Sequence, residues 1–539
     1  MSELHLPGLP FSKITQIGQV PKIGGEAIIS ALDMGSNSFH LIVVRAHTST
    51  SFEVLVKEKT MLRLGDVVSR LGYIDQEHLE SIIKIIRSYR ALSEFVGASE
   101  MVALATSAFR DADNSSDVVD LVEEETGVSV SVISGRKEAE LIFKAVSSSV
   151  HFPGDRAICA DLGGGSLELM IGTQSDLIWS QSFNLGVGRL SAKFIEDTSS
   201  ISSKEIAKMR RHVRETLAPV SKTLEELQPS SLIGSSGSFL NLGRMAILHK
   251  KPDTDPSLLD DLNQVAVKRS ALISLTKLVL KCSADQRASI SGLDSKRVEI
   301  IPAASVILEE LFRICHSKEM ILSEWALREG IILAELESYD ISSGDTGSIR
   351  LSSVMGVTKR FSWNDLHAEQ VASLALSLFD QLLELHQLSP QDRELLHYGA
   401  LLHDIGEHIA MEDHDKHSAY LIENSRLRGF SPEEKRALIC IGRFHRRGTP
   451  REDFQPFALL DEQWQARVVK LVSILRLADA LDRSHEDIVT SLDVDVKNQT
   501  VILRPTGEGD LELESFGLRR KRSLFESTFK TKVVLEGRS

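Results

Sequence analysis

The sequence has few cysteines, no long apolar run and less positive than negative charge. Its four cysteines among 539 residues show no Cys-x-x-Cys spacing, which argues against a disulfide framework or structural zinc site and indicates a reduced compartment. No apolar run approaches the ~20 residues of a membrane-spanning helix, and residues 1–24 lack the apolar core of a signal peptide. Lysine and arginine number 62 against 76 acidic residues, a net charge of −14, which argues against general nucleic-acid binding. We therefore expect a cytoplasmic protein with neither a membrane nor a nucleic-acid partner.

Two glycine-rich acidic turns are the most informative feature that is present. Asp33-Met34-Gly35-Ser36-Asn37-Ser38 and Asp161-Leu162-Gly163-Gly164-Gly165-Ser166 each stand between two apolar stretches. Glycine lets backbone N–H groups approach phosphate oxygens, and an aspartate suits a hard cation or a water. The repetition predicts a duplicated domain whose halves bind one phosphorylated ligand between them. The predicted phosphate-binding residues of these turns are Asp33, Gly35, Ser36, Asn37, Ser38, Gly163, Gly164, Gly165 and Ser166.

Three further features of the first half suit the hydrolysis of a phosphoanhydride. Arg110 follows a short apolar segment and can make a bidentate phosphate contact. Glu138 lies just after a glycine turn that opens a helix, where a general base can reach a water in the cleft. A third glycine turn before a helix offers N–H groups to further phosphates; it comprises Gly234, Ser235, Ser236, Gly237 and Ser238. Taken singly, such turns and charged residues are usually structural or solvated, so their number and order carry the interpretation.

Apolar spacing predicts the organisation of the chain. We expect strands at 27–32, 39–46, 52–58 and 101–106 and a helix at 76–96. A polar stretch at 338–348 is typical of a linker, and helical spacing follows it. Near the end, Val501–Leu503 and the alternating Leu511-Glu512-Leu513-Glu514 predict strands. The expected parts are a flexible tail (1–24), two α/β domains (25–140 and 141–335), a helical domain (349–490) and a small C-terminal α/β module (491–539).

The helical domain carries a second set of chemical groups. His367, His403-Asp404 and Asp479 resemble the HD phosphohydrolase pattern, and imidazole with carboxylate suits manganese, iron, cobalt or zinc. His417 and His445 extend the set to two metals. The alternative is a scaffold whose metal site has decayed. Basic clusters at 443–451 and 519–522 are either solvated surface or a track for a polyanion.

Several of these motifs together resemble the exopolyphosphatase and guanosine-pentaphosphate phosphohydrolase family, over nearly the whole chain. This family lies within the actin-like superfold of sugar kinases and heat-shock ATPases. The segments that carry the resemblance are Asp33–His40, Ala105–Arg110, Ile133–Gly135 with Glu138-Ala139, Asp161–Ser166 with Glu168, Trp325–Gly330, His417–Tyr420 and Leu524–Glu526.

The resemblance implies an α/β fold: duplicated actin-like, ribonuclease H-like domains, then an all-α HD-type domain and the C-terminal module. It also implies a magnesium-dependent enzyme that removes terminal phosphates from inorganic polyphosphate, with guanosine pentaphosphate as a second substrate, and a homodimer. Glu138 matches the catalytic glutamate, Asp161 and Glu168 match the acidic residues for magnesium and water, and Arg110 matches a phosphate-binding position.

Two positions depart from the family pattern and leave alternatives open. Lys137 stands where an acid often precedes the catalytic glutamate, and Leu167 replaces a common threonine. These departures leave the chain-length preference open. The alternative functions are a small-molecule kinase of the same superfold and a non-catalytic sensor of polyphosphate or an alarmone.

Overall fold

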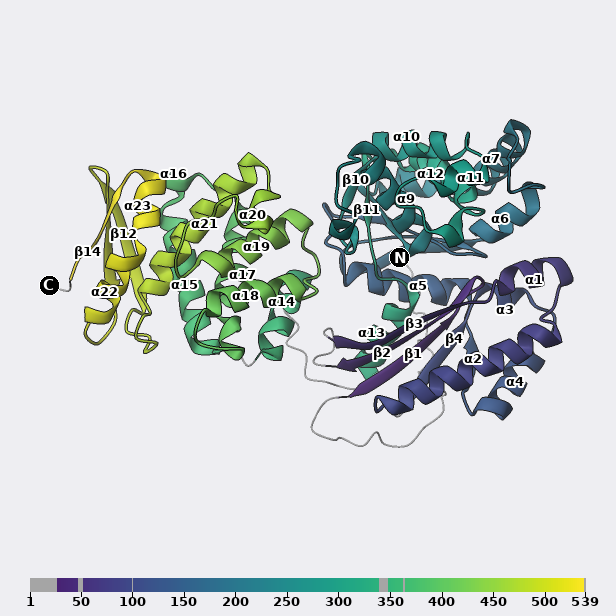
Figure 1. The fold of residues 1–539 in the computed structure, drawn as a ribbon, viewed down its shortest axis with the longest axis horizontal. Coiled ribbons are helices and arrows are strands. Elements are labelled where there is room, and N and C mark those ends of the chain that lie inside the picture. Colours follow the sequence, from purple (N-terminus) through teal and green to yellow (C-terminus); the bar gives the residue numbers. More distant parts are fainter. Residues whose placement is uncertain (1–26, 47–51, 99, 339–347, 362–363, 538–539) are drawn as a thin grey trace, which may run out of the picture.

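The computed structural model describes residues 27–46, 52–98, 100–338, 348–361 and 364–537. The tail predicted for 1–24 and most of the linker predicted for 338–348 lie outside these residues. The described chain forms two α/β units that lie against each other and a helical unit beside them, which ends in a small sheet (Figure 1). No described helix is both long and apolar enough to cross a membrane.

The first unit is a mixed sheet with helices on one face. Its strands run in the order β3-β2-β1-β4-β5, antiparallel from β1 to β3 and parallel from β1 to β5. Its elements are β1 (Ile28–Met34), β2 (Ser38–Ala46), β3 (Phe52–Met61), α1 (Leu64–Leu71), α2 (Gln76–Phe95), β4 (Met101–Ala105), α3 (Ser107–Asp111), α4 (Ser115–Thr126) and β5 (Val130–Val132). The strands and the helix predicted by apolar spacing are confirmed.

The second unit repeats this order of strands. Its sheet runs β10-β11-β9-β6-β7-β8, with β6 to β8 antiparallel and β9 and β11 parallel to β6. Its strands are β6 (Ala157–Leu162), β7 (Leu167–Gly172), β8 (Leu177–Phe183), β9 (Ser231–Ser235), β10 (Ala266–Lys268) and β11 (Glu319–Leu322). Its helices are α6 (Val187–Phe194), α7 (Ser203–Leu217), α8 (Val220–Leu227), α9 (Ser236–Lys250), η1 (Pro256–Leu259), α10 (Arg269–Val279), α11 (Ala284–Ala288), η2 (Ser295–Arg297) and α12 (Ile301–Cys315).

Two helices, α5 (Gly135–Ser147) and α13 (Leu327–Ser338), form a layer between the two sheets. Alternation along the strands decides which side chains face this layer. Ala31 of β1, Cys159 of β6 and Met170 of β7 belong to one buried cluster with side chains of both helices. The same alternation turns Asp33 and Asp161 toward the middle layer. The predicted domain boundary at 140/141 falls inside α5, and the exact domain limits stay predictions.

The helical unit begins at 349 and has one apolar core shared with the C-terminal module. Short polar N-caps start several of its helices; Ser389 and Ser431 each accept a hydrogen bond from the backbone three residues on. The elements are α14 (Ile349–Arg360), α15 (Asp365–Gln381), α16 (Leu383–His386), α17 (Pro390–Leu402), η3 (Ile405–His408), α18 (His414–Asn424), α19 (Pro432–Phe444), α20 (Gln455–Ala458) and α21 (Glu462–Ala480).

The C-terminal module is α/β, as expected, but one of its predicted strands is wrong. A three-stranded sheet of β12 (Ser491–Lys497), β13 (Thr500–Thr506) and β14 (Lys532–Leu535) flanks α22 (Glu512–Lys521) and α23 (Ser523–Phe529). The alternating residues 511–514 begin α22 instead of forming a strand. There the Glu514 side chain is buried and accepts a hydrogen bond from the backbone of Ser484, so a tertiary contact overrides the local alternation.

Candidate functional site

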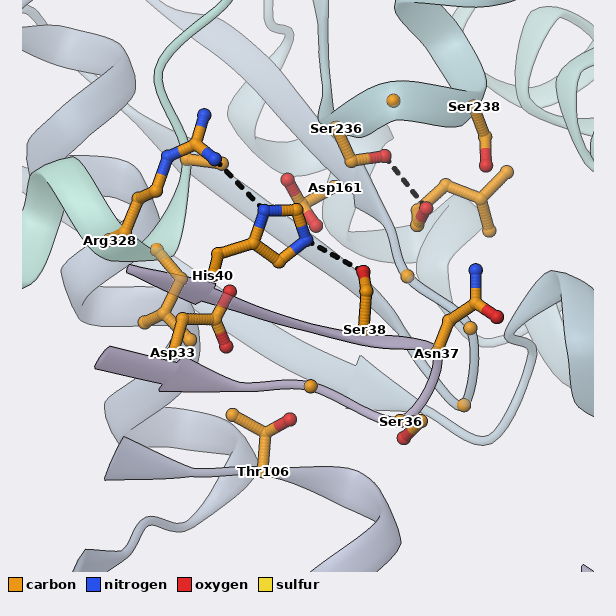
Figure 2. Close-up of a pocket in the computed structure, with 18 of the residues that line it drawn as sticks. Asp33, Ser36, Asn37, Ser38, His40, Thr106, Asp161, Ser236, Ser238 and Arg328 are labelled. Carbon is orange, nitrogen blue, oxygen red and sulfur yellow. Dashed lines mark hydrogen bonds between the residues drawn. The ribbon is translucent and has the colours of Figure 1, made fainter. Parts of the chain in front are cut away.

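The two glycine-rich turns face each other across a cavity of about 340 Å³ between the α/β units. The turns close the β1–β2 and β6–β7 hairpins, in which Asp33 pairs with His40 and Asp161 pairs with Glu168. Figure 2 shows Asp33 and Asp161 near His40 among the residues that line this cavity. The predicted residues that line it are Asp33, Gly35, Ser36, Asn37, Ser38, Glu138, Asp161, Gly163, Gly164, Gly165, Ser166, Ser236, Gly237 and Ser238.

Close contact between the two turns explains the need for glycine at two positions. A Cβ atom at Gly165 would lie 2.4 Å from Ser107 Oγ and 2.7 Å from Ser36 Oγ, and one at Gly164 would lie 3.0 Å from Asn37 Cβ. Real Cβ atoms do not come this close to other atoms, so a side chain at Gly165 would force the Ser36 and Ser107 hydroxyls to move. The glycines therefore let the halves of the cavity close on each other, in addition to leaving backbone N–H groups accessible.

Four carboxyl groups lie close to one another at the cavity: Asp33, Glu138 and Asp161 line it, and Glu168 is buried just behind them. Burial, together with the nearby Glu138 and Asp161, raises the pKa of Asp33 to about 8 against the opposing effect of Arg328. Burial also raises the pKa of Asp161 to about 6. Burial, together with Glu138 and Asp161, raises the pKa of Glu168 well above its usual range. Arg110 pairs with Glu138 and Arg328 lies near Asp33, but Asp161 and Glu168 have no ion-pair partner among the described residues, and a bound divalent cation would balance them.

Arg110 contacts Glu138 rather than lining the cavity. Its Nη1 donates a hydrogen bond to Glu138 Oε2 at 2.7 Å and another to the Ile133 carbonyl at 2.9 Å. Burial raises the pKa of Glu138 to about 6, while Arg110 acts in the opposite direction. Ser134 caps the helix that carries Glu138 by accepting a hydrogen bond from the Lys137 backbone. The structure thus gives Arg110 a contact that its position in the sequence did not indicate.

Three other predicted site residues lie just outside the cavity lining. Glu168 is buried on β7, where the Ser182 hydroxyl donates to it at 2.7 Å. Ser235 is also buried, and its hydroxyl donates to Asp161 Oδ2 at 2.5 Å. Gly234 lies in β9, where a Cβ would meet the Met320 sulfur at 2.6 Å. These residues therefore support the carboxylates and the strand behind the cavity.

The cavity includes a hydrogen-bonded row that sequence reasoning missed. Arg328 donates to His40 Nδ1 at 3.0 Å, and His40 Nε2 lies 2.7 Å from Ser38 Oγ (Figure 2). Because arginine only donates, Nε2 carries the proton and donates to Ser38. Burial lowers the pKa of His40, and Arg328 and Lys59 lower it further, which keeps the ring neutral. The Ser38 hydroxyl is thus left free to donate its own proton toward the cavity.

Three cations of the cavity lining were also missed: Lys57, Lys59 and Arg297. Burial lowers the pKa of Lys59 to about 8, with Arg297 adding to the effect. Alternation in β3 places Lys57 and Lys59 on one face, but the strand has no glycine turn or acidic partner that would have marked them as site residues. The lining therefore combines acidic groups with several positive charges.

The helical unit brings together a second group of polar side chains, the histidine cluster. It has two parts, each with ligand atoms within 4.8 Å of one another: His367, His403 and Asp479, and Asp404, His414 and His445. His417, which was predicted to extend the site, is in neither part, and His414 on the same helix takes that place. The predicted residues His367, His403, Asp404, Asp479 and His445 do meet.

All four imidazoles of the histidine cluster are oriented in the same way. His403, His414 and His445 direct Nδ1 at the carbonyl three residues earlier, at 2.6, 3.0 and 2.8 Å. His367 Nδ1 contacts Asp482 Oδ2 at 2.7 Å. Because Nδ1 must donate to a carbonyl, the other nitrogen of these three rings presents a lone pair. Histidines that bind a metal through one ring nitrogen usually donate a hydrogen bond of this kind from the other nitrogen.

The inward-facing atoms of the histidine cluster have no satisfactory partners among the described residues. Nε2 of His367 and Nε2 of His403 are buried and make no hydrogen bond. Nε2 of His414 and Nε2 of His445 lie 3.2 Å apart, so two lone pairs face each other. His445 Nε2 also lies 3.1 Å from Asp404 Oδ1. Acceptors that face acceptors in a buried site leave room for cations between them.

One ligand candidate of the histidine cluster already has a cationic partner. The Lys521 ammonium forms an ion pair with Asp479. Burial alone would raise the pKa of Asp479, but Lys521 and the neighbouring His403 and His445 lower it overall. Lys521 comes from α22 in the C-terminal module, so the module contributes directly to this part of the helical unit.

The fold and the cavity define an actin-like protein with an acidic, glycine-lined site between its two halves. Residues 43–339 match the Ppx/GppA phosphatase family, and residues 349–514 match domain III of the Ppx/GppA phosphatases. The chain therefore belongs to the Ppx/GppA phosphatase family, and the resemblance noted in the sequence is confirmed.

Known relatives are similar over the larger part of their length. Exopolyphosphatase 1 of Mycobacterium tuberculosis is 31% identical over 327 residues, which are 60% of this chain and 92% of the relative. The crystal structure of an exopolyphosphatase from Cytophaga hutchinsonii has a TM-score of 0.54 and 27% identity, covering 59% of this chain and 100% of that one. The Aquifex aeolicus member of the Ppx/GppA family has a TM-score of 0.50 and 20% identity, covering 59% and 100%; it supports the fold alone.

Proposed function

We propose that the cavity between the α/β units hydrolyses the terminal phosphoanhydride of inorganic polyphosphate. The main observation in support of this function is that two glycine turns, a buried glutamate and several cations meet at one cavity. The family and the exopolyphosphatase relatives support the same reaction. Phosphoanhydride hydrolysis requires chiefly an aligned water and stabilisation of negative charge, and the residues present supply both.

In this proposal Glu138 is the general base. Its carboxylate accepts a proton from water while the water oxygen attacks the terminal phosphorus. The bridging P–O bond then breaks, and inorganic phosphate leaves the shortened chain. A base is most effective when its pKa lies near the working pH, and burial raises the pKa of Glu138 toward neutrality, to about 6. Arg110 holds this carboxylate in place and favours its ionised form.

Asp161 and Glu168 are the residues we assign to magnesium. Both are carboxylates in the unbalanced cluster, and magnesium prefers carboxylate and phosphate oxygens. When bound, the ion would neutralise charge on the phosphates and lower the cost of ionising the cluster. The turns around Gly35 and Gly164 would bind phosphate oxygens through backbone N–H groups, and Lys57, Lys59 and Arg297 would hold the next phosphates of the chain.

Guanosine pentaphosphate is the second substrate that we propose, on the strength of the family. Its 5′ end presents a terminal phosphoanhydride, so it requires the same attack on a terminal phosphorus. Phosphate release from long-chain polyphosphate and from guanosine pentaphosphate, measured side by side with magnesium, tests both assignments. Release from polyphosphate is expected; release from neither substrate would contradict the proposed function.

We further propose that the helical unit is an HD-type domain whose histidine cluster binds divalent transition metal. Imidazole and carboxylate ligands together suit manganese, iron, cobalt or zinc. The common orientation of the four imidazoles and the unpaired Nε2 atoms support the proposal. Because both oxygens of Asp404 approach histidine nitrogens, at 3.3 Å from His403 and 3.1 Å from His445, this carboxylate is suited to bridge two ions. Elemental analysis of purified protein tests the site.

A further inference from the structure

The two basic clusters of the sequence meet around a single cavity in the second half of the protein. The loop after α19 supplies residues 446–449, α21 and its C-terminus supply Arg476 and Arg483, and α22 with α23 supplies the rest. We call this space, of about 540 Å³, the basic cavity. Its lining is Arg446, Arg447, Gly448, Thr449, Arg476, Arg483, Phe516, Gly517, Arg520, Lys521, Ser523, Leu524 and Ser527.

The charge of the basic cavity is one-sided. Six of its lining residues are cationic and none is acidic, in a protein whose net charge is −14. Among the described residues, Arg446, Arg483 and Arg520 have no carboxylate within ion-pair distance, whereas Arg447 pairs with Asp413. Guanidinium groups gathered without acids repel one another and attract an anion. A phosphate group, with several acceptor oxygens, matches these donors.

The size and the remaining lining of the basic cavity fit a small phosphorylated molecule. The volume lies in the usual range for small-molecule sites, about 300 to 1,000 Å³. Phe516 is 49% exposed, and the Arg520 guanidinium lies 5.6 Å from the centre of its ring. Ser523 and Ser527 add hydroxyl groups. Donors for a phosphate thus stand beside an apolar surface that the rest of a ligand can contact.

Lys521 connects the basic cavity with the histidine cluster. It lines the cavity and forms the ion pair with Asp479. One ammonium group cannot fully neutralise both Asp479 and a phosphate. A metal cation that binds Asp479 would leave the Lys521 ammonium available to the phosphate. A phosphate that pairs with Lys521 would in turn leave Asp479 available to the metal cation. Coupling of this kind is reciprocal, because each ligand changes the affinity of the other by the same factor.

We propose that the basic cavity is a second phosphate-binding site, separate from the cleft between the α/β units. We also propose that Lys521 couples the two sites, so that phosphate binding in the basic cavity and metal binding in the histidine cluster strengthen each other. The ligand class is a compound with a terminal phosphate group. The cooperative part rests on the metal site proposed above; the phosphate site itself does not.

The phosphate site is tested by counting inorganic phosphate bound to the full-length protein in calorimetric titrations. Arg483→Ala combined with Arg520→Ala should remove one site per chain or weaken it by at least about tenfold, because charged hydrogen bonds from arginine to phosphate are stronger than neutral ones. Arg519→Ala is the matched control, because Arg519 carries the same charge on the same helix but does not line the cavity. Equal binding by the wild type and the double variant would overturn the proposal.

The source of the phosphate group is identified with the same variants. Adenosine monophosphate and long-chain polyphosphate serve as probes. Because the cleft between the α/β units also binds polyphosphate, the number of sites is compared. Loss of a nucleotide site in the double variant identifies a small phosphate ester as the ligand, and loss of one polyphosphate site alone identifies a chain end. An unchanged number of sites for both probes in the double variant would contradict a phosphate site here.

The coupling is tested by repeating the phosphate titration with and without manganese. Manganese should tighten phosphate binding in the wild type, and Lys521→Met should abolish that change. An unchanged effect of manganese in a folded Lys521→Met variant would refute the role of Lys521. If the wild type binds no manganese, the metal site proposed above fails and the coupling fails with it, while the phosphate count still decides on the basic cavity.

Discussion

Arg110 and Glu138 form a partly buried ion pair, in which the guanidinium donates to the carboxylate at 2.7 Å and also to the backbone carbonyl of Ile133. This pair joins the end of α3 in the first unit to the start of α5 in the middle layer. Arg110 is therefore a positioning residue for Glu138, and its effect on the reaction should pass through the ionisation of that carboxylate.

Replacing Arg110 should change the pH dependence of the reaction. Burial raises the pKa of Glu138 and Arg110 opposes that rise, so Arg110→Ala should raise the pKa further. Since the base must be ionised, the acidic limb of kcat/KM should move to higher pH. Arg110→Lys should give a smaller shift because it keeps a charge. Arg136→Ala, at an exposed arginine paired with Glu140, is the control; an unmoved limb in folded Arg110→Ala would exclude this role.

Gly165→Ala should displace two serine hydroxyls at the glycine turns of the cavity. The new Cβ would lie within 2.7 Å of the hydroxyls of Ser36 and Ser107, which must move to accommodate it. We expect a large rise in KM for polyphosphate, because phosphate contacts from both turns would be displaced. Gly163→Ala should cost much less, since its Cβ would meet only the Ser166 carbonyl at 3.5 Å. Steady-state kinetics measure both, and equal losses would contradict the steric argument.

The carboxylate cluster should make stability depend on pH and on magnesium. The pKa of Asp33 is raised from 3.8 to about 8 in the folded protein, so between these values the folded state binds a proton that the unfolded state has lost. Stability of the metal-free protein therefore falls as pH rises through this window. Magnesium binds the ionised carboxylates, so its increase in Tm should be larger near about pH 8 than near about pH 5.5. A magnesium effect that is equal or smaller at the higher pH would argue against this cluster as its site.

Removal of the histidine cluster should leave polyphosphate hydrolysis largely intact. His403→Ala combined with Asp404→Ala removes ligands from both parts of the cluster, so bound transition metal should disappear and the Tm should fall, because metal ties several helices together. Magnesium-dependent phosphate release depends on other residues and should continue. Loss of all phosphate release in a folded variant would show that the reaction depends on the helical unit, and would contradict its assignment to the cavity between the α/β units.

The sequence predicted the first site better than the second because turns and strand alternation are local. Glycine turns after apolar strands placed Asp33 and Asp161 correctly, and duplication implied that they would meet. Local patterns carry no information about which helix faces lie together. His414 and His417 are one turn apart on α18, and only packing decides that His414 joins the cluster.

Tertiary contacts also explain the other differences between prediction and structure. Nothing near Arg110 in the sequence indicates its pairing with Glu138, which depends on the approach of α3 to α5. The alternating residues after Asp510 follow a strand period, yet Glu514 is held in a helix by a buried contact with Ser484. The meeting of two basic clusters at one cavity likewise depends on how α22 packs against α21.

The most direct measurement is phosphate release from long-chain polyphosphate, with magnesium, by the wild type, Glu138→Gln and Glu140→Gln. Glu140 lies on the same helix and pairs with Arg136 on the surface, so it controls for the chemical change itself. We predict that Glu138→Gln folds and binds polyphosphate but turns over at least about a hundredfold more slowly, while Glu140→Gln stays near the wild type. Near-normal turnover by a folded Glu138→Gln would contradict the assignment of the general base.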